Sequence, residues 1–371
     1  MKVAFQVDQL WFAAPGGIGT YVAELAQALT ALADGPKVVG FRARIDGTPH
    51  RPPGVPVVEL AATIGRLYPA WALLGRPHLP APLDACDVVH ATNHASIPPV
   101  RRGQALVATV HDLAFDRFPT LFPPSWRWLY RAGVRAAIAR AHRLLVPSRS
   151  TARDLADRGA DPTRIAVTPL APALPTATGD PGPVLERLKI PRPYVVCPAT
   201  IEPRKNQAIL VRAFRQAAAE LPHALVLAGP VGWRTGSLEA ELARGGPGTI
   251  VRTGGLSAED LDAVYRGADA VAYPSRYEGF GLVIVEAMAR GVPVVTSTTP
   301  ACSEVAGDAA LLVDPDDVGG LADALVRACT DAGLRAELVR RGRRRVEGLS
   351  WAATAHATLR AYRQALAEVR G

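Results

Sequence analysis

Cysteine is scarce in this chain, and long apolar runs are missing. Its four cysteines lie far apart and have neither metal-binding nor redox spacing: Cys86, Cys197, Cys302 and Cys329. We therefore expect buried free thiols in a reducing cytosol and not a disulfide framework. No apolar run approaches the length that spans a bilayer, and the chain begins directly with a predicted strand instead of an export signal. These absences favour a cytoplasmic protein that is soluble or attached peripherally to the inner face of the membrane.

Signals for nucleic-acid binding are also missing, although the chain is basic. A formal charge of +8 would suit nucleic acid, anionic lipid or an acidic substrate. No recognised nucleic-acid motif or basic–aromatic platform accompanies this charge. The strongest candidate is the run RRGRRR at residues 340–345, which we interpret as a solvated helix end between two helical stretches. We therefore expect no nucleic acid among the partners.

Apolar residues, in contrast, are abundant and follow an alternating α/β order. With 49% hydrophobic content, 371 residues are enough for two α/β domains that each have a core. In the first part we predict strands at residues 2–7, 37–41, 87–91, 105–110, 143–146 and 165–168, and helices at residues 20–32, 125–141 and 150–157. The stretch 172–193 contains six prolines and little periodicity, so we predict that it links the two domains.

Two glutamates flank a predicted helix start in the second part. A buried strand is followed by a loop with Gly279 and Gly281 and then by a helix at residues 282–289. The first N–H groups of such a helix point toward the carboxyl edge of the sheet, where a diphosphate fits. Glu278 in the loop can reach sugar hydroxyls, and Glu286 in the apolar helix needs donors such as those of a ribose. The pattern suits a nucleoside diphosphate sugar, and the alternative is a surface acid beside a structural one.

A second cluster places two cations at another predicted strand end. Arg204 and Lys205 follow a strand that begins at Tyr194 and precede a helix. Adjacent cations at a helix entrance are costly unless they are solvated or paired with an anion, and here they could neutralise a leaving diphosphate. The alternative is a solvated basic turn, as most charged loop residues are exposed.

These motifs resemble those of the retaining GT-B glycosyltransferases of glycosyltransferase family 4. The resemblance is carried by EPRKN at residues 202–206, the E-x7-E pair Glu278 and Glu286, PVVTS at 293–297, EVAGDAALLVDP at 304–315, GGIGTY at 16–21, TVHDL at 109–113 and SWA at 350–352. The chain departs from the family pattern at Val283 and Ala171, where the family often has proline and usually has glycine. Neither departure alters a charge of the motifs.

The resemblance implies an α/β protein of the GT-B fold, with two Rossmann-like α/β/α domains that face a central cleft. We expect an N-terminal acceptor-side domain at residues 1–177, a linker at 178–193 and a C-terminal nucleotide-sugar-binding domain at 194–350. The terminal helix, 351–371, would return to the first domain.

The resemblance also implies the site residues. Arg204 and Lys205 would bind the diphosphate, Glu278 the donor sugar and Glu286 the ribose, and His111 would act on the sugar near the reacting carbon. The remaining residues expected at the donor are Gly17, Gly19, Gly279, Phe280, Gly281 and Leu282. His90, Asn93 and His94 follow another strand end and are candidates for the acceptor side.

Two of these assignments have alternatives. The run GGIG at residues 16–19 lies between the first predicted strand and helix, but Val22 occupies the third glycine position of a dinucleotide fingerprint. A plain tight turn explains it equally well. His111 follows a predicted strand and should lie at its carboxyl edge, but a lone histidine can also be a hydrogen-bonded core residue.

We expect no metal site. The DPD run at residues 314–316 copies the D-x-D motif of other glycosyltransferases, but here it follows a strand and opens a helix at about Val318, so a turn and a helix cap explain it. Arg204, Lys205 and helix amides can offset the diphosphate charge that Mg²⁺ would otherwise meet.

The reaction expected from the resemblance is transfer of a hexosyl group to a hydroxyl of a glycan, lipid-linked or small-molecule acceptor, as in polysaccharide biosynthesis. Mannosyl is the first expected hexosyl group. GDP-mannose is the first expected donor and a UDP-hexose the second, with no cofactor required. The alternatives are a nucleotide-sugar epimerase, a sugar-phosphate synthase of the same fold, or a non-catalytic nucleotide-sugar-binding protein.

Peripheral membrane contact is a further hypothesis. Residues 125–145 carry an apolar stripe at helical spacing, with Arg127, Arg131 and Arg135 along another face. This arrangement is typical of an interfacial helix, although a packed helix with a solvated arginine face has the same spacing.

Overall fold

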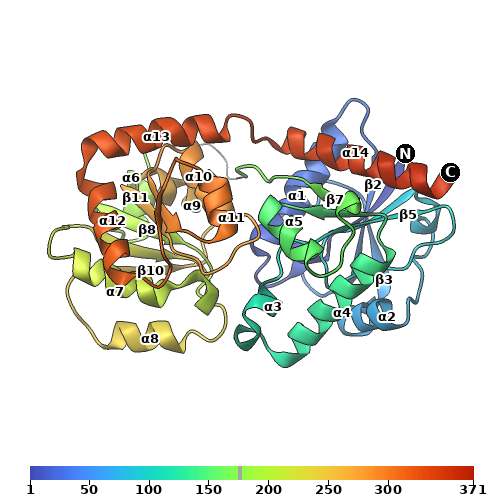
Figure 1. Cartoon of the computed structure of the whole chain (residues 1–371), viewed down its shortest axis with the longest axis horizontal. Coiled ribbons are helices and arrows are strands. Elements are labelled where there is room, and N and C mark those ends of the chain that lie inside the picture. The colour runs from blue at the N-terminus through green and yellow to red at the C-terminus, as the bar shows by residue number, and fades with distance from the viewer. Residues whose placement is uncertain (174–177) are drawn as a thin grey trace. The chain divides into compact units, whose positions relative to one another are not determined.

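The computed structural model describes residues 1–173 and 178–371. The chain forms two compact units, one made of Met1–Leu170 with Ser350–Gly371 and the other of Ala171–Leu349 (Figure 1). The predicted end of the first domain, residue 177, lies outside the described residues. The predicted linker, 178–193, contains the helix α6 (Gly182–Arg187) and belongs to the second unit. Its prolines are compatible with this helix because Pro181 and Pro183 occupy the N-cap and first turn, where no N–H is needed.

The first unit is built on a seven-stranded parallel sheet with the order β3-β2-β1-β4-β5-β6-β7. The strands are β1 (Lys2–Gln6), β2 (Lys37–Arg44), β3 (Val57–Thr63), β4 (Val88–Ala91), β5 (Ala105–Thr109), β6 (Arg143–Val146) and β7 (Ile165–Val167). The central strands β4 and β5 are fully buried, which explains their continuous apolar runs. The structure confirms the six predicted strands and adds β3, whose edge position leaves only Leu60 buried.

Helices cover both faces of this sheet. They are α1 (Gly16–Ala31), α2 (Ile64–Leu73), α3 (Ala114–Arg117), α4 (Pro124–Arg140), α5 (Arg149–Ala156) and α14 (Trp351–Arg370), with short 3-10 turns at η1 (Asp8–Trp11), η2 (Leu83–Ala85), η3 (Pro119–Leu121) and η4 (Pro162–Arg164). The GGIG run was expected in a loop before the helix, and this was wrong, because it forms the first turn of α1. A side chain at Gly19 would place its Cβ 2.5 Å from that of Pro15, so the turn closes only with glycine there.

The apolar stripe of α4 faces the core of the first unit. Val134 and Ala137 are buried, and Leu129, Tyr130 and Ile138 pack against the same cluster. The packed-helix alternative is therefore confirmed for this stripe. Large apolar side chains of α4 remain exposed at its first turns, where Trp126 and Trp128 each keep 47% of their surface.

The second unit has a six-stranded parallel sheet with the order β10-β9-β8-β11-β12-β13. Its strands are β8 (Tyr194–Pro198), β9 (Ala224–Ala228), β10 (Thr249–Gly254), β11 (Ala270–Tyr273), β12 (Val294–Ser297) and β13 (Leu311–Val313). Its helices are η5 (Pro203–Lys205), α6, α7 (Gln207–Ala217), α8 (Gly236–Ala243), α9 (Ala258–Arg266), α10 (Leu282–Ala289), α11 (Pro300–Ala306), α12 (Val318–Thr330) and α13 (Ala332–Val346). In Figure 1, α7 and α8 lie on the opposite side of this sheet from α10 and α13.

The strand order reverses between β8 and β11, which pair in parallel through Ala270 with Val195 and Val271 with Val196. The loops that leave these two strands therefore emerge side by side at the carboxyl edge of the sheet. In open α/β sheets, ligands bind at such a switch point.

The arginine-rich run forms the end of helix α13, as predicted, and most of its arginines are exposed. Residues 340–345 form the last turns of α13, where Arg340 and Arg341 pair with Glu337. A Cβ at Gly342 would lie 3.0 Å from the Met288 side chain, because α13 packs closely on α10 there. The run is thus a helix face stabilised by local ion pairs and by contact with the unit's own core.

The terminal helix α14 packs on the first unit, in which the chain also begins. The Tyr362 hydroxyl lies 2.6 Å from Nδ1 of His90 on β4, and Thr354 donates to the carbonyl of Pro169 at 2.6 Å. The cysteines are free and buried, as predicted. Over the part of the chain that the structure describes, no helix is long and apolar enough to cross a membrane.

Candidate functional site

The two loops at the β8–β11 switch point bring Arg204, Lys205 and Glu278 into contact. Asn206, in the left-handed conformation with φ of 63°, ends η5 and turns the chain into α7. Its side-chain amide donates to the carbonyl of Pro274 at 3.2 Å and so ties the first loop to the second. The amide of Arg276 donates back to the carbonyl of Arg204 at 2.9 Å. One side-chain bond and one backbone bond therefore hold the two loops together.

The Glu278 carboxylate lies at the centre of this contact and is 8% exposed. Nη1 of Arg204 lies 2.9 Å from Oε2, and Nζ of Lys205 lies 2.6 Å from Oε1. The Tyr273 hydroxyl and the Ser275 hydroxyl donate to Oε1 at 2.8 and 2.5 Å. Burial alone would raise the pKa of Glu278, but the charges of Arg204 and Lys205 outweigh it and lower the pKa to about 2. Glu278 is therefore ionised at neutral pH.

The side chains of Arg204 and Lys205 are not solvated, because carboxylates of the protein already neutralise their charges. Arg204 also donates to Oε1 of Glu202 at 2.7 Å, so two cations face two carboxylates. The solvated basic turn considered above is wrong, since Arg204 and Lys205 side chains are only 15% and 11% exposed. Such a buried, hydrogen-bonded cluster is preorganised, so its charged groups can meet a polar ligand with little reorganisation.

The helix beside this cluster begins as predicted, at Leu282. Gly281, its N-cap, has φ of +107°, a conformation that side chains rarely adopt, and it contributes no side-chain cap. Phe280 before it is buried. The first N–H groups of α10 thus lack a capping side chain at the same sheet edge as Glu278, and an anion would complement them.

Glu286 lies in the second turn of α10 and is 7% exposed. The Tyr265 hydroxyl donates to its Oε2 at 3.0 Å, and burial followed by the charge of Glu286 raises the pKa of Tyr265 well above its usual value. Arg290, one turn on, donates to the Glu286 carbonyl at 2.8 Å and pairs with buried Asp262 at 2.8 Å. The protein therefore supplies a donor to Glu286, so a ribose is not needed to satisfy it, and ribose binding stays a prediction.

In the first unit, His111 follows β5 at the carboxyl edge, as predicted. Its Nε2 lies 2.8 Å from the carbonyl of Thr92, which can only accept, so Nε2 carries the proton and Nδ1 is the acceptor in the neutral ring. Tyr21 packs edge-on against the imidazole with ring centroids 4.8 Å apart. Burial lowers the pKa of His111, which favours the neutral form. Gly17 is exposed and Gly19 buried in the first turn of α1 of the same unit.

The three acceptor-side candidates, His90, Asn93 and His94, differ in their hydrogen-bond partners. Burial lowers the pKa of His90 to about 3, and both its ring nitrogens have hydroxyl partners, Tyr362 and Thr109. Asn93 bonds Gln9 and its own loop. His94 stacks on Phe115 and is 5% exposed, yet neither ring nitrogen has a hydrogen-bond partner among the described residues. His94 is therefore the strongest of the three candidates for contact with a polar ligand.

Several residues of the cluster were missed from the sequence. Glu202 lies inside the EPRKN motif but was not assigned a role, and Tyr273 and Ser275 lie five and three residues before Glu278. Two hydroxyls so close to a carboxylate after a buried strand are a signal that could have been used, because a buried carboxylate needs several donors. Tyr265 carries no such local signal, since it reaches Glu286 from α9.

The DPD run acts as a turn and leads into a helix cap, as predicted. Oδ1 of Asp314 accepts from the amide of Asp316 at 2.8 Å, and Oδ1 of Asp317 caps α12 through the amide of Gly320 at 2.9 Å. Across residues 1–173 and 178–371, no group of three or more His, Cys, Asp or Glu side chains is placed to hold a metal ion.

Comparison with known sequences identifies relatives along both units. Residues 192–331 match the family described as Glycosyl transferases group 1, and residues 15–171 match Glycosyltransferase Family 4. An O-antigen chain mannosyltransferase B from Escherichia coli is 32% identical over 304 residues, which cover 79% of this chain and 76% of the relative. A D-inositol 3-phosphate glycosyltransferase from Acidothermus cellulolyticus is 32% identical, covering 96% of this chain and 87% of the relative.

Solved structures of glycosyltransferases and related enzymes have the same fold as this chain. A sucrose-phosphate synthase from Thermosynechococcus elongatus superposes with a TM-score of 0.74 at 22% identity, covering 99% of this chain and 100% of that one. Anabaena HepE in complex with UDP and glucose gives a TM-score of 0.73 at 19% identity, covering 97% of this chain and 98% of that one. At these identities the likeness shows the fold, and it confirms the GT-B prediction of two parallel-sheet α/β domains.

Proposed function

The chain belongs to glycosyltransferase family 4 and is a transferase, and we propose that it transfers a hexosyl group to an acceptor hydroxyl with retention of configuration. The proposed donor is a nucleoside diphosphate sugar, and mannosyl is the first candidate for the transferred group. The observation that carries this proposal is the buried cluster of Arg204, Lys205 and Glu278 at the β8–β11 switch point. It unites cations for a diphosphate and an ionised acid for sugar hydroxyls beside the uncapped start of α10.

The proposed chemistry is electrostatic. Arg204, Lys205 and the amides at the start of α10 stabilise the charge that develops on the departing diphosphate. Glu278 remains ionised because of its low pKa, so it accepts hydrogen bonds from sugar hydroxyls and favours the positively charged, oxocarbenium-like transition state. The acceptor oxygen attacks from the face that the diphosphate leaves, and its proton passes to a phosphate oxygen. No side-chain nucleophile is required. His111 is proposed to meet the sugar near the reacting carbon.

For the donor, GDP-mannose is the first candidate, supported by the name of the Escherichia coli relative, a mannosyltransferase. A UDP-hexose is the second, because Anabaena HepE is described in complex with UDP and glucose. A thermal-shift panel of GDP, UDP and TDP sugars separates them, since a ligand bound only by the native state raises the melting temperature. A rise of the melting temperature with GDP-mannose alone supports the first candidate, and a rise with UDP sugars alone replaces it.

The transfer itself is tested by product analysis with a radiolabelled donor. Acceptors should include a glycan, a lipid-linked glycan and a polyol phosphate, because one relative is named a D-inositol 3-phosphate glycosyltransferase. Label in a new glycoside with retained anomeric configuration supports the proposal. Label recovered only as an isomerised nucleotide sugar indicates an epimerase, and label in a sugar phosphate indicates a synthase. Nucleotide binding without turnover of any acceptor indicates a binding protein.

We place the enzyme in the cytoplasm, with peripheral membrane contact through the first turns of α4. Trp126 and Trp128 are exposed there, and the helix carries arginines that suit anionic headgroups. Flotation with anionic liposomes at low salt tests this contact. Wild-type protein should float, and the double variant Trp126→Ala, Trp128→Ala should float much less. Absence of wild-type flotation removes the hypothesis.

A further inference from the structure

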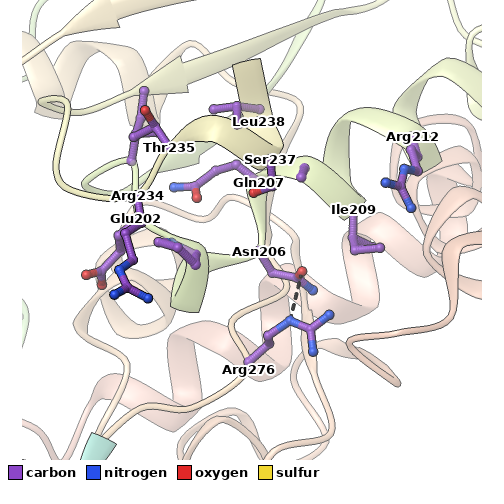
Figure 2. Close-up of a pocket in the computed structure, with 13 residues that line it drawn as sticks. Glu202, Asn206, Gln207, Ile209, Arg212, Arg234, Thr235, Ser237, Leu238 and Arg276 are labelled. Carbon is purple, nitrogen blue, oxygen red and sulfur yellow. Dashed lines mark hydrogen bonds between the residues drawn. The ribbon is translucent and has the colours of Figure 1, made fainter. Parts of the chain in front are cut away.

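A pocket lies between α7 and α8 in the second unit, beside η5. Its cavity volume is about 290 Å³, close to the lower limit of ligand pockets, whose volumes run from about 300 to 1,000 Å³. Figure 2 shows its lining, with Glu202 and Arg234 together at one side of the view and Arg212 at the opposite side. The residues from α10 take no part in the lining. The volume suits a monosaccharide-sized molecule and not a nucleotide.

The pocket offers positive charge and backbone donors. Its lining includes the first turns of both α7 and α8, whose N-caps, Asn206 and Thr235, provide no side-chain cap. Two helix N-termini that converge on one cavity favour an anion there. Arg234 and Arg276 add guanidinium groups to the same lining, and Arg276 also pairs with Asp316 and donates to Oδ1 of Asn206 at 3.2 Å. A phosphate complements this set of donors, since guanidinium groups and helix amides are its usual partners.

Arg234 has an unfavourable backbone conformation. Its φ is +53°, in the left-handed region that favours glycine. A charged residue kept in such a conformation at the edge of a cavity is a candidate for function.

Glu202 indicates that the ligand also carries a hydrogen-bond donor. The residue is 3% exposed, and while Oε1 accepts from Arg204, Oε2 is buried without a hydrogen-bond partner among the described residues. Glu202 lines the pocket. A buried carboxylate oxygen without a donor is unfavourable, and a ligand hydroxyl in the cavity would satisfy it. Free phosphate is a poorer match, because its negative charge would lie next to the carboxylate.

We propose that the α7–α8 pocket binds a small hydroxylated phosphate ester of the size of a hexose phosphate, at a site separate from that of the donor sugar. The phosphate lies against Arg234, Arg276 and the two helix N-termini, and a hydroxyl donates to Oε2 of Glu202. Glu202 also holds Arg204, which holds Glu278, so an occupant touches a residue that orients the donor cluster. The binding does not rest on the transfer reaction and can be measured without turnover.

The test is isothermal titration calorimetry of the full chain with three probes: mannose 6-phosphate, mannose and inorganic phosphate. Mannose 6-phosphate should bind at least tenfold more tightly than either of the others. Equal affinity for inorganic phosphate overturns the hydroxyl contact to Glu202, and absence of heat with mannose 6-phosphate overturns the site.

Two variants locate the binding. Arg234→Gly removes the guanidinium and suits the left-handed backbone, so it should weaken mannose 6-phosphate binding at least tenfold without unfolding. Lys189→Gly is the matched control, because Lys189 is an exposed cation with φ of 54° outside the pocket. Ser237→Trp, at an exposed lining position, should fill the cavity and abolish binding while the thermal shift by nucleotide sugars is kept. Unchanged affinity in both pocket variants places mannose 6-phosphate elsewhere and overturns the proposal.

Discussion

At the scale of single residues, the carboxylate of Glu278 combines burial with a strongly lowered pKa. Two cations and two hydroxyls surround it, so its ionised form is stabilised in the folded chain beyond what water provides. Its proposed function and its contribution to stability therefore depend on the same contacts. Removing the charge should affect both.

The first prediction concerns the pH dependence of this contribution. The folded-state pKa of Glu278, about 2, lies below the ordinary value of 4.5. The ion pairs therefore stabilise the fold fully above pH 4.5, and the stabilisation is lost as the pH falls toward 2. The difference in unfolding free energy between wild type and Glu278→Gln should shrink by up to about 3 kcal/mol across this window.

Urea unfolding at a series of pH values measures this difference. Glu259→Gln, which changes an exposed acid of α9, is the control and should give a small difference at every pH. A Glu278→Gln difference that stays constant from pH 5 to 2 would contradict the lowered pKa.

The second prediction concerns turnover. Lys205→Ala and Glu278→Ala should each reduce kcat by about 10²-fold or more, the usual effect of removing a group that stabilises developing charge. Glu286→Ala should mainly raise KM for the donor, because its role is proposed to be ribose binding. Steady-state kinetics on folded variants tests these outcomes, with Lys37→Ala, an exposed cation of β2, as the control. Wild-type rates in folded Lys205→Ala would refute the assignment.

The sequence predicts some contacts of the candidate site and not others. The sequence predicts that Arg204, Lys205 and Glu278 lie at neighbouring strand ends, because both loops follow buried strands. It does not predict that both cations pair with Glu278 directly, since that depends on side-chain directions across 73 and 74 positions of chain. The partner of Glu286, Tyr265, was likewise out of reach because it belongs to another helix.

At the scale of elements, close packing decides where prediction succeeds. The helix α10 and the strand β6 have the predicted bounds because they are short, apolar and buried, and their ends are marked by glycine or polar residues. The edge strand β3 and helix α2 were missed. Only Leu60 of β3 is buried, so no continuous apolar run marks it, and α2 carries Pro69 inside its span, which reads as a break.

The third prediction tests close packing between α4 and the loop after β4. A Cβ at Gly133 would lie 2.0 Å from the carbonyl oxygen of His94, so Gly133→Ala must push the helix from the core. It should destabilise the protein by about 2 kcal/mol or more, although alanine is the better helix former. Gly65→Ala in α2, where a Cβ meets nothing within 4 Å, should be neutral or stabilise by up to about 1 kcal/mol. Denaturant midpoints compare the two, and equal effects would contradict the packing.

At the scale of the whole molecule, the first unit is completed by the far end of the chain. Helix α14 buries Leu359, Tyr362 and Leu366 and supplies the hydroxyl that bonds His90. The second unit, in contrast, contains all six strands of its own sheet within one continuous segment.

The fourth prediction follows from this difference. A fragment Ala171–Leu349 should fold with a cooperative thermal transition and, where the donor proposal is right, bind the nucleotide. A fragment of residues 1–170 should be aggregated or poorly ordered, and adding a peptide of residues 350–371 should restore order. Circular dichroism and size-exclusion chromatography measure both. A cooperative, monomeric 1–170 fragment would show that α14 is dispensable.

The same topology sets a rule for building hybrids between this enzyme and its relatives. A single crossover near residue 170 would join the second unit of one parent to an amino-terminal half whose last covering helix comes from the wrong parent. Recombination should instead exchange residues 171–349 as a cassette between two junctions. Where the donor proposal is right, donor preference would then be transferred with the cassette, and the recipient would keep its own first and last segments.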